Sequence, residues 1–226
     1  MKSPVHLPYA FEDPAERGAA GEQRWKVVTV ELCKELFDGQ PAKILDFGSG
    51  RGELLQLLSA NHFTCIGLDA DPKCVELSSR FSESHLIKDL SFVNKFPAGS
   101  FDLVVALHVL EHLQNPGEYV NALKSLTRRY LIFGVPNLAT ITGMQFCRVK
   151  YVNEGHLQGW DFNHFKTFTE LNCGLRLVKW VPDFVVVPKI SQLLHRIGLR
   201  SFLEERLLPR LLPYQSNSII GLFEKV

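Results

Sequence analysis

Ile44-Leu45-Asp46-Phe47-Gly48-Ser49-Gly50-Arg51-Gly52 is the stretch that decides the fold of this 226-residue chain. Three of its first four residues are apolar, which is typical of a buried strand. The glycines that follow let the backbone turn tightly and let a ligand approach with no Cβ in the way. A helix that begins near Gly52 points its free N–H groups and its positive dipole end at a bound carboxylate. The stretch predicts a strand, a ligand-binding turn and a helix in succession.

Apolar runs and amphipathic segments alternate on both sides of this stretch, which predicts repeated strand and helix units. Strands are expected at Lys43 to Phe47, Thr64 to Asp69, His85 to Asp89, Phe101 to Leu107 and Tyr130 to Val135, and helices at Gly52 to Ala60, Pro72 to Phe81 and Pro116 to Leu126. Two later runs, Leu175 to Val181 and Asn217 to Phe223, are expected to form a terminal antiparallel pair. The fold class is therefore α/β, with a doubly wound sheet that is mostly parallel.

Composition favours one soluble domain over residues 1–226, because 46% of the chain is hydrophobic and 22% is charged. The formal net charge of +1 predicts no extended positive potential that would attract a polyanion, so no nucleic-acid partner is expected. The five cysteines are odd in number and never spaced as C-x-x-C, which disfavours a disulfide framework and a cysteine zinc site. A cytoplasmic location is the simplest setting.

Three segments outside the strand and helix units are expected to flank the sheet. Residues 1–40 are predicted to form an N-terminal helical cap, with a helical segment at Ala15 to Phe37. The interval 138–166 is too long for an ordinary connection and predicts a lid on the acceptor side. The leucine-rich and arginine-rich stretch 190–212 is expected to pack on the sheet as helices. Its alternative is a peripheral contact with a membrane or a protein partner.

Three aspartates lie at or next to the ends of the first three predicted strands, at the sheet edge where open parallel sheets bind ligands. Asp46 can meet an ammonium group, and Asp69 stands where an acid accepts hydrogen bonds from a ribose diol. Asp89 can accept a hydrogen bond from an adenine amine. An adenosine joined to an amino acid satisfies all three, which indicates S-adenosylmethionine. A dinucleotide is disfavoured because its fingerprint requires glycine where Glu53 stands.

Four motifs carry a family resemblance: Ile44 to Leu54, Gly67 to Asp71, Lys88 to Leu90 and Phe101 to Leu113. They resemble the successive motifs of class I S-adenosylmethionine-dependent methyltransferases, which implies a Rossmann-like, seven-stranded fold and that cofactor. The resemblance also implies the cofactor-binding residues, namely Asp46, Gly48, Ser49 and Gly50 for the methionine moiety, Asp69 for the ribose, and Asp89 with Leu90 for the adenine. Ala70 and Leu107 are expected to be further cofactor contacts.

Leu107 to Leu113 has two interpretations. The H-x-x-E-H spacing from His108 to His112 is that of an inverted zinc protease, but the motif follows a buried strand instead of lying within a long helix. The run also resembles the L-E-H stretch of ubiquinone-biosynthesis O-methyltransferases, in which carboxylates bind a divalent metal. Because His108 replaces the first carboxylate, no metal is predicted.

The acceptor side contributes the candidate catalytic and substrate-binding histidines. His108 and His164 are candidate catalytic residues, and His108 can remove the acceptor's proton or pack beside the cofactor. Substrate contacts are expected from His112, His156 and Trp160, with Glu111 and His112 alternatively serving as helix-start and packing groups. In another interpretation, Trp160 is buried in an aromatic cluster that anchors the lid, with the histidines exposed.

The segment Arg128 to Asn137, together with His164-Phe165 and Thr167 to Leu171, resembles the MetW-like branch and methyltransferases of glycan-assembly clusters. The resemblance implies a methyltransferase that acts on a small-molecule or glycan-like acceptor at O or N. Its alternative is a non-catalytic or weakly catalytic partner of an acyltransferase.

Overall fold

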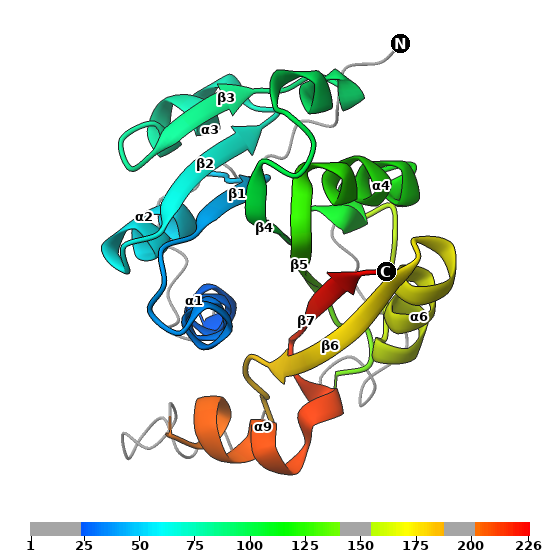
Figure 1. The fold of residues 1–226 in the computed structure, drawn as a ribbon. Coiled ribbons are helices and arrows are strands. Elements are labelled where there is room, and N and C mark those ends of the chain that lie inside the picture. The colour runs from blue at the N-terminus through cyan, green and yellow to red at the C-terminus, as the bar shows by residue number, and fades with distance from the viewer. Residues whose placement is uncertain (1–23, 141–154, 188–201) are drawn as a thin grey trace.

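The computed structural model describes residues 24–140, 155–187 and 202–226, which form a seven-stranded sheet flanked by helices (Figure 1). The strand order is β3-β2-β1-β4-β5-β7-β6. The strands are β1 (Lys43–Phe47), β2 (Thr64–Asp69), β3 (Glu83–Leu86), β4 (Phe101–Leu107), β5 (Thr127–Pro136), β6 (Leu175–Pro182) and β7 (Ser218–Lys225). The α/β class and the mostly parallel sheet predicted from the sequence are confirmed.

The sheet has a parallel part and an antiparallel part. The first five strands pair in parallel, and β7 lies antiparallel between β5 and β6. The predicted terminal antiparallel pair is therefore present. The strand order reverses between β1 and β4, which is the place where an open parallel sheet binds its ligand beyond the strand ends.

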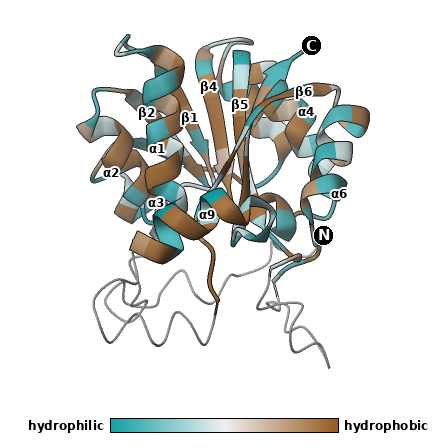
Figure 2. Cartoon of the chain, turned by 90° about the horizontal axis from the view of Figure 1, so that it is seen from below, coloured by the Kyte–Doolittle hydropathy of each residue, from teal (hydrophilic) through white to brown (hydrophobic). Residues whose placement is uncertain are grey.

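Helices cover both faces of the sheet (Figure 1). The side chains of each strand alternate between the two faces, so each face carries apolar residues that the helices bury. From β1, Ile44 joins the cluster under α1 and α2, and Leu45 joins the cluster under α4. Figure 2 shows that β1, β4 and β5 are largely hydrophobic, as two-sided burial requires. The helices are α1 (Arg24–Phe37), α2 (Glu53–Ala60), α3 (Pro72–Ser78), α4 (Pro116–Leu126), α6 (Phe162–Thr167) and α9 (Leu208–Leu211).

The third strand differs from its predicted position. It was expected at His85 to Asp89, but β3 spans Glu83–Leu86, with Leu86 paired to Asp69 at the end of β2. Pairing with β2 sets these bounds, and the edge strand has only a weak apolar pattern of its own. Asp89 instead caps a 3₁₀ turn, Leu90–Lys95, by accepting a hydrogen bond from the Ser91 N–H.

The helix at the end of the expected lid changes its winding before β6. Asp161 caps α6 at its start, and a π-helical turn, Phe168–Asn172, follows directly. The Cys173 N–H donates to the Phe168 carbonyl across five residues, and Gly174 then takes φ +59°. Gly174 ends the helix after this turn, and the chain continues into β6.

The segments predicted to flank the sheet are described only in part. The N-terminal cap is represented by α1, because residues 1–23 lie outside the described residues. Residues 141–154 of the expected lid also lie outside them, and α6 occupies its end. Of the 190–212 stretch, a π-helical turn, Leu203–Leu207, and α9 are described. In the described part of the chain, no helix has the length and apolar character needed to span a bilayer.

Candidate active site at the carboxyl edge of the sheet

The glycine turn after β1 is held tightly between β2 and the segment after β4. Gly48 has φ +79°, and its N–H donates to the Leu68 carbonyl at 2.7 Å. A Cβ added at Gly48 would lie 2.2 Å from Cγ2 of Val109. Glycine is therefore required at this position, and the contact brings the chain after β4 against the turn.

Asp69, at the end of β2, fixes the second glycine of the turn. Its Oδ2 accepts a hydrogen bond from the Gly50 N–H at 2.8 Å, and its Oδ1 accepts one from the Asp71 N–H at 2.9 Å. Burial raises the pKa of the Asp69 carboxyl, and these hydrogen bonds oppose the shift. Among the described residues, no heavy atom outside its chain neighbours lies within 4 Å of a Cβ built on Gly50, where φ is +53°. Asp69 holds this side of the turn in place.

Two buried polar side chains stand beside the turn. Asp46 is buried in β1, and burial together with the neighbouring Asp69 raises its pKa to about 7. Lys26 on α1 opposes this shift, and Glu53 adds to it. The Ser49 hydroxyl is also buried and has no hydrogen-bond partner among the described residues. The carboxyl edge of β1 therefore offers one acid and one hydroxyl to a ligand.

The other cofactor residues predicted from the sequence lie on the neighbouring strand ends. Ala70 directly follows Asp69, and Leu107 is buried as the last residue of β4. Asp89 is three residues beyond the end of β3, where hydrogen bonds from Ser91 lower its pKa. Leu90 packs against the core beside it. The structure thus arranges these positions along the edge formed by β1, β2, β3 and β4.

His108 is held firmly where β4 ends. Its N–H donates to the Gly134 carbonyl at 2.8 Å, and its backbone takes φ +55°, a conformation that histidine rarely adopts. Its ring lies 4.7 Å from that of Trp25, between centroids, and Nε2 lies 3.1 Å from the Ser218 hydroxyl. The Ser218 N–H donates to the buried Asp183 carboxylate. Backbone strain maintained by such packing is common at functional sites.

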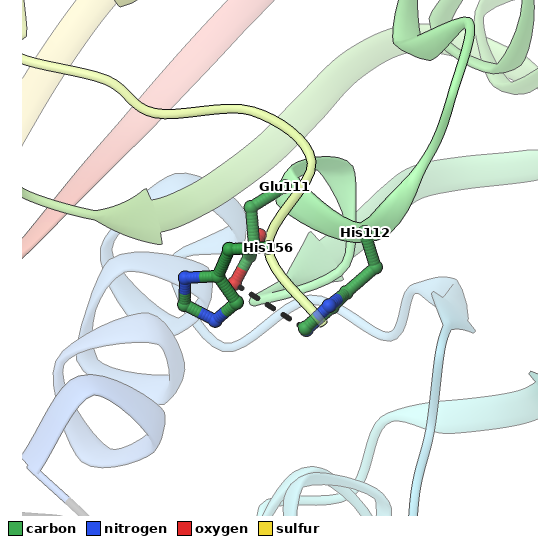
Figure 3. Close-up of side chains that lie close together, drawn as sticks. All are labelled: Glu111, His112 and His156. Atoms are coloured by element: carbon green, nitrogen blue, oxygen red, sulfur yellow. Dashed lines mark ion pairs between the residues drawn. The ribbon is translucent and has the colours of Figure 1, made fainter. Parts of the chain in front are cut away.

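Glu111, His112 and His156 point toward one another beside His108 (Figure 3). Glu111 is 1% exposed, and neither of its carboxylate oxygens has a hydrogen bond among the described residues. Its Oε1 lies 3.6 Å from Nδ1 of His108 and 3.9 Å from Nε2 of His112. Burial lowers the pKa of His156, although the charge of Glu111 opposes this. The arrangement surrounds a buried carboxylate with three imidazoles.

Sequence reasoning treated Glu111 as a helix-start or packing group and gave no site role to Trp25 or Ser218. The sequence signals for Glu111 were the H-x-x-E-H spacing and the L-E-H stretch within Leu107 to Leu113. The backbone carbonyl of Glu111 accepts hydrogen bonds from the N–H groups of Leu157 and Gln158, which brings the segment carrying His156 to this place. This contact joins residues that are far apart in the sequence, so no local sequence pattern predicts it.

Two residues predicted for the acceptor side lie elsewhere. Trp160 is 8% exposed and packs on Phe165 and Phe168, so in this structure it is part of the hydrophobic core. The side chain of His164 is 80% exposed on α6, and its Nδ1 pairs with Asp161 at 2.6 Å. The structure does not bring His164 into the group formed by His108, Glu111, His112 and His156. For Trp160 and His164 it agrees with the interpretation in which an aromatic cluster anchors this segment, whereas His156 is half-buried and not exposed.

Comparisons with known proteins agree with this architecture. A crystal structure of an S-adenosylmethionine-dependent methyltransferase from Archaeoglobus fulgidus matches with TM-score 0.66 and 18% identity, over 97% of this chain and 100% of that one. The magnesium protoporphyrin IX methyltransferase of Synechocystis PCC 6803, solved with S-adenosylhomocysteine, matches with TM-score 0.63 and 15% identity, over 96% and 92%. At these identities the likeness establishes the fold.

Sequence comparison adds a relative and a family. Ajmaline N-methyltransferase of Rauvolfia serpentina is 26% identical over 133 residues, which cover 52% of this chain and 46% of that enzyme. This chain therefore spans about half the length of that relative. Residues 21–172 match the model of a methyltransferase domain family, which is more than half of the chain. With the fold and the motifs at β1, β2 and β4, the match shows that the chain belongs to this methyltransferase domain family, within the class I S-adenosylmethionine-dependent methyltransferases.

Proposed function

We propose that this enzyme methylates a small-molecule or glycan-like acceptor at oxygen or nitrogen, with His108 as the base that takes the acceptor's proton. One observation carries the proposal: Val109 packs directly on Gly48, so that His108 and Glu111 adjoin the cofactor turn. Residues that act on an acceptor must lie this close to the methyl donor, because the transfer needs the reacting atoms in line.

The residues of the turn fit the cofactor. The buried Asp46 suits its ammonium group, the Ser49 hydroxyl lacks a hydrogen bond among the described residues, and a Cβ at Gly50 would meet none of their heavy atoms within 4 Å. We assign the binding of the methionine moiety to Asp46, Gly48, Ser49 and Gly50. The ribose is assigned to Asp69 and Ala70, and the adenine to Asp89 and Leu90. Leu107 is assigned a further contact with the cofactor. When bound, S-adenosylmethionine supplies an electrophilic methyl carbon on a sulfonium sulfur.

The environment of His108 suits proton transfer. Ser218 and Trp25 fix its ring, and Glu111 lies near Nδ1, where a carboxylate stabilises the imidazolium that forms when the proton arrives. Asp183 holds the Ser218 backbone and so positions this contact. We assign acceptor contacts to His112 and His156, because they lie with His108 around Glu111.

Catalysis is favoured over a non-catalytic role as the partner of an acyltransferase. The cofactor turn, with its buried acid and its glycines, and the chain's membership of a methyltransferase domain family both support an active enzyme. A partner protein that only retained the fold would have no need of a strained histidine beside that turn.

Incubation of the protein with methyl-labelled S-adenosylmethionine and a panel of small hydroxyl, amine and sugar acceptors tests the proposal. We expect labelled product from at least one acceptor class. Asp69→Ala should weaken S-adenosylmethionine binding by roughly 1–3 kcal/mol, because it frees the Gly50 N–H and removes the ribose acceptor. If the folded wild-type protein binds no S-adenosylmethionine in a calorimetric titration, the proposal is wrong.

Cofactor affinity is expected to depend on pH through Asp46. Because the pKa of Asp46 is raised to about 7, its carboxyl is mostly protonated below that pH and must lose the proton to pair with an ammonium group. Its contribution to folding stability is correspondingly present at low pH and is lost as the pH rises toward 7. We expect the dissociation constant to rise about tenfold for each pH unit below about 7, and to level off above it.

Calorimetric titrations between about pH 5.5 and about pH 8 measure this dependence. The Asp46→Asn variant is the control. It should bind the cofactor more weakly and with little change over the same range, because the titrating group is gone. A wild-type affinity that stays constant below neutral pH would exclude Asp46 as the ammonium partner.

A further inference from the structure

Glu111 is a buried carboxyl group that lacks hydrogen bonds from the described residues. Its side chain is 1% exposed, and neither carboxylate oxygen receives a hydrogen bond from the described residues. A buried carboxylate without such bonds is costly unless a cation stands beside it. The nearest basic groups, His108 and His112, lie 3.6 Å and 3.9 Å from Oε1, which is beyond hydrogen-bond distance. The site therefore calls for a positive charge.

The tautomer of His112 favours a metal ion as that charge. Nδ1 of His112 lies 2.8 Å from the Gly155 carbonyl oxygen, which can only accept, so Nδ1 carries the proton and donates it. In the neutral ring this leaves an electron pair on Nε2, the nitrogen that faces Glu111. A backbone carbonyl that fixes one ring nitrogen is the usual arrangement behind a metal-binding histidine.

His156 completes a set of three ligands. Its ring meets that of His112 edge to face, with centroids 4.9 Å apart, and one ligand atom from each of the three residues lies within 4.8 Å of the others. Bonds of about 2.0–2.2 Å to one zinc ion would require the three atoms to approach by roughly an ångström. Rotation of the two imidazole side chains is sufficient for such a change.

We propose that Glu111, His112 and His156 bind one divalent metal ion of the zinc type. Two imidazole nitrogens and one carboxylate oxygen are a donor set that zinc accepts, whereas magnesium prefers oxygen ligands alone. Three protein ligands leave a fourth position for water or for an oxygen of the acceptor. The sequence analysis predicted no metal because His108 replaces a carboxylate, but the third ligand proposed here, His156, comes from the expected lid, 138–166.

The role of this ion rests on the proposed function, but its binding does not. Val109 joins the glycine turn to the segment that carries Glu111 and His112, so the ion would lie on the acceptor side of the cofactor. There it would orient an acceptor hydroxyl and ease the loss of its proton, and His112 and His156 would then reach the acceptor through the ion. Metal binding and cofactor binding are separate measurements, so either proposal can fail without the other.

The test uses the full chain, stripped with a chelator and titrated with Zn²⁺, with Co²⁺ as the spectroscopic probe. We expect one equivalent of each metal, and visible Co²⁺ bands strong enough to indicate four or five ligands. Glu111→Gln and His156→Gln should each weaken Zn²⁺ binding by at least about tenfold to 100-fold, because each removes a ligand. His85→Gln is the control, since His85 lies on β3 and pairs with Glu83.

Cofactor titration of the same samples shows whether each variant is folded. Loss of Zn²⁺ in Glu111→Gln and His156→Gln, with S-adenosylmethionine binding retained, would support the site. A wild-type protein that binds S-adenosylmethionine but no stoichiometric Zn²⁺ would overturn the metal site and leave the proposed function standing. Equal loss of Zn²⁺ in the His85→Gln control would also overturn it.

Discussion

Replacing Gly48 with alanine is expected to lower the free energy of unfolding by about 2–5 kcal/mol and to abolish cofactor binding. The left-handed backbone conformation, with φ +79°, costs a residue with a Cβ about 1–2 kcal/mol. The new methyl group would also lie 2.2 Å from Val109 Cγ2, and relieving such an overlap costs about 1–3 kcal/mol. The turn must then move away from Asp46 and Asp69. Chemical denaturation and calorimetric titration measure the two effects.

Gly39→Ala is the matched control for the Gly48 variant. Gly39 has φ +76°, and a Cβ there would meet no described atom within 4 Å, so only the backbone cost applies. We expect Gly39→Ala to be mildly destabilised and to bind the cofactor normally. The double variant Gly48→Ala, Val109→Ala should recover part of the lost stability, because Cγ2 is absent. If the Gly48 variant were no less stable than the Gly39 variant, the close packing of Val109 on the turn would be refuted.

Replacing His108 with asparagine is expected to lower kcat by about 10²–10⁴-fold, while the cofactor dissociation constant stays within about twofold. Asparagine tolerates the left-handed backbone that His108 adopts, with φ +55°, so the variant should fold. It offers no basic nitrogen to receive the acceptor's proton. Steady-state kinetics with the acceptor found in the panel, together with cofactor titration, separate the loss of a base from the loss of binding.

His62→Asn is the control for this substitution, because His62 also has φ above zero, at +66°, and lies exposed in the turn between α2 and β2. Its kcat should match that of the wild-type protein. A normal kcat in His108→Asn would exclude His108 as the base, and Glu111 would then be the next group to test.

The strands and helices of the parallel core could be predicted, because the sequence pattern that indicates each of them lies within the element itself. The strands β1, β2 and β4 and the helix α4 have the bounds expected from apolar runs and from Pro116 at the helix start. The edge strand β3 could not be placed to the residue, because its bounds follow from pairing with β2 and not from its own pattern.

The candidate site was predictable on the cofactor side and only partly on the acceptor side. Asp46, Asp69 and the glycines lie next to strand ends, so their places follow from the fold class. The group around Glu111 depends on two backbone hydrogen bonds to Leu157 and Gln158, which join parts of the chain more than forty residues apart. The sequence periodicity does not predict such a contact. The length of the interval 138–166 predicted a lid on the acceptor side, but it could not show which of its side chains reach the site and which, like Trp160 and His164, do not.

The position of β7 has a consequence for the order in which the molecule can be assembled. Within the described residues, β6 pairs with β7 alone, although β6 is made first as the chain leaves the ribosome. The sheet therefore cannot be completed in the order of synthesis, and the edge strand β6 must wait until β7 has docked beside β5. Ser218, which holds His108, is the first residue of β7. The newly made enzyme should therefore gain its stability and its correctly held histidine in the same late step.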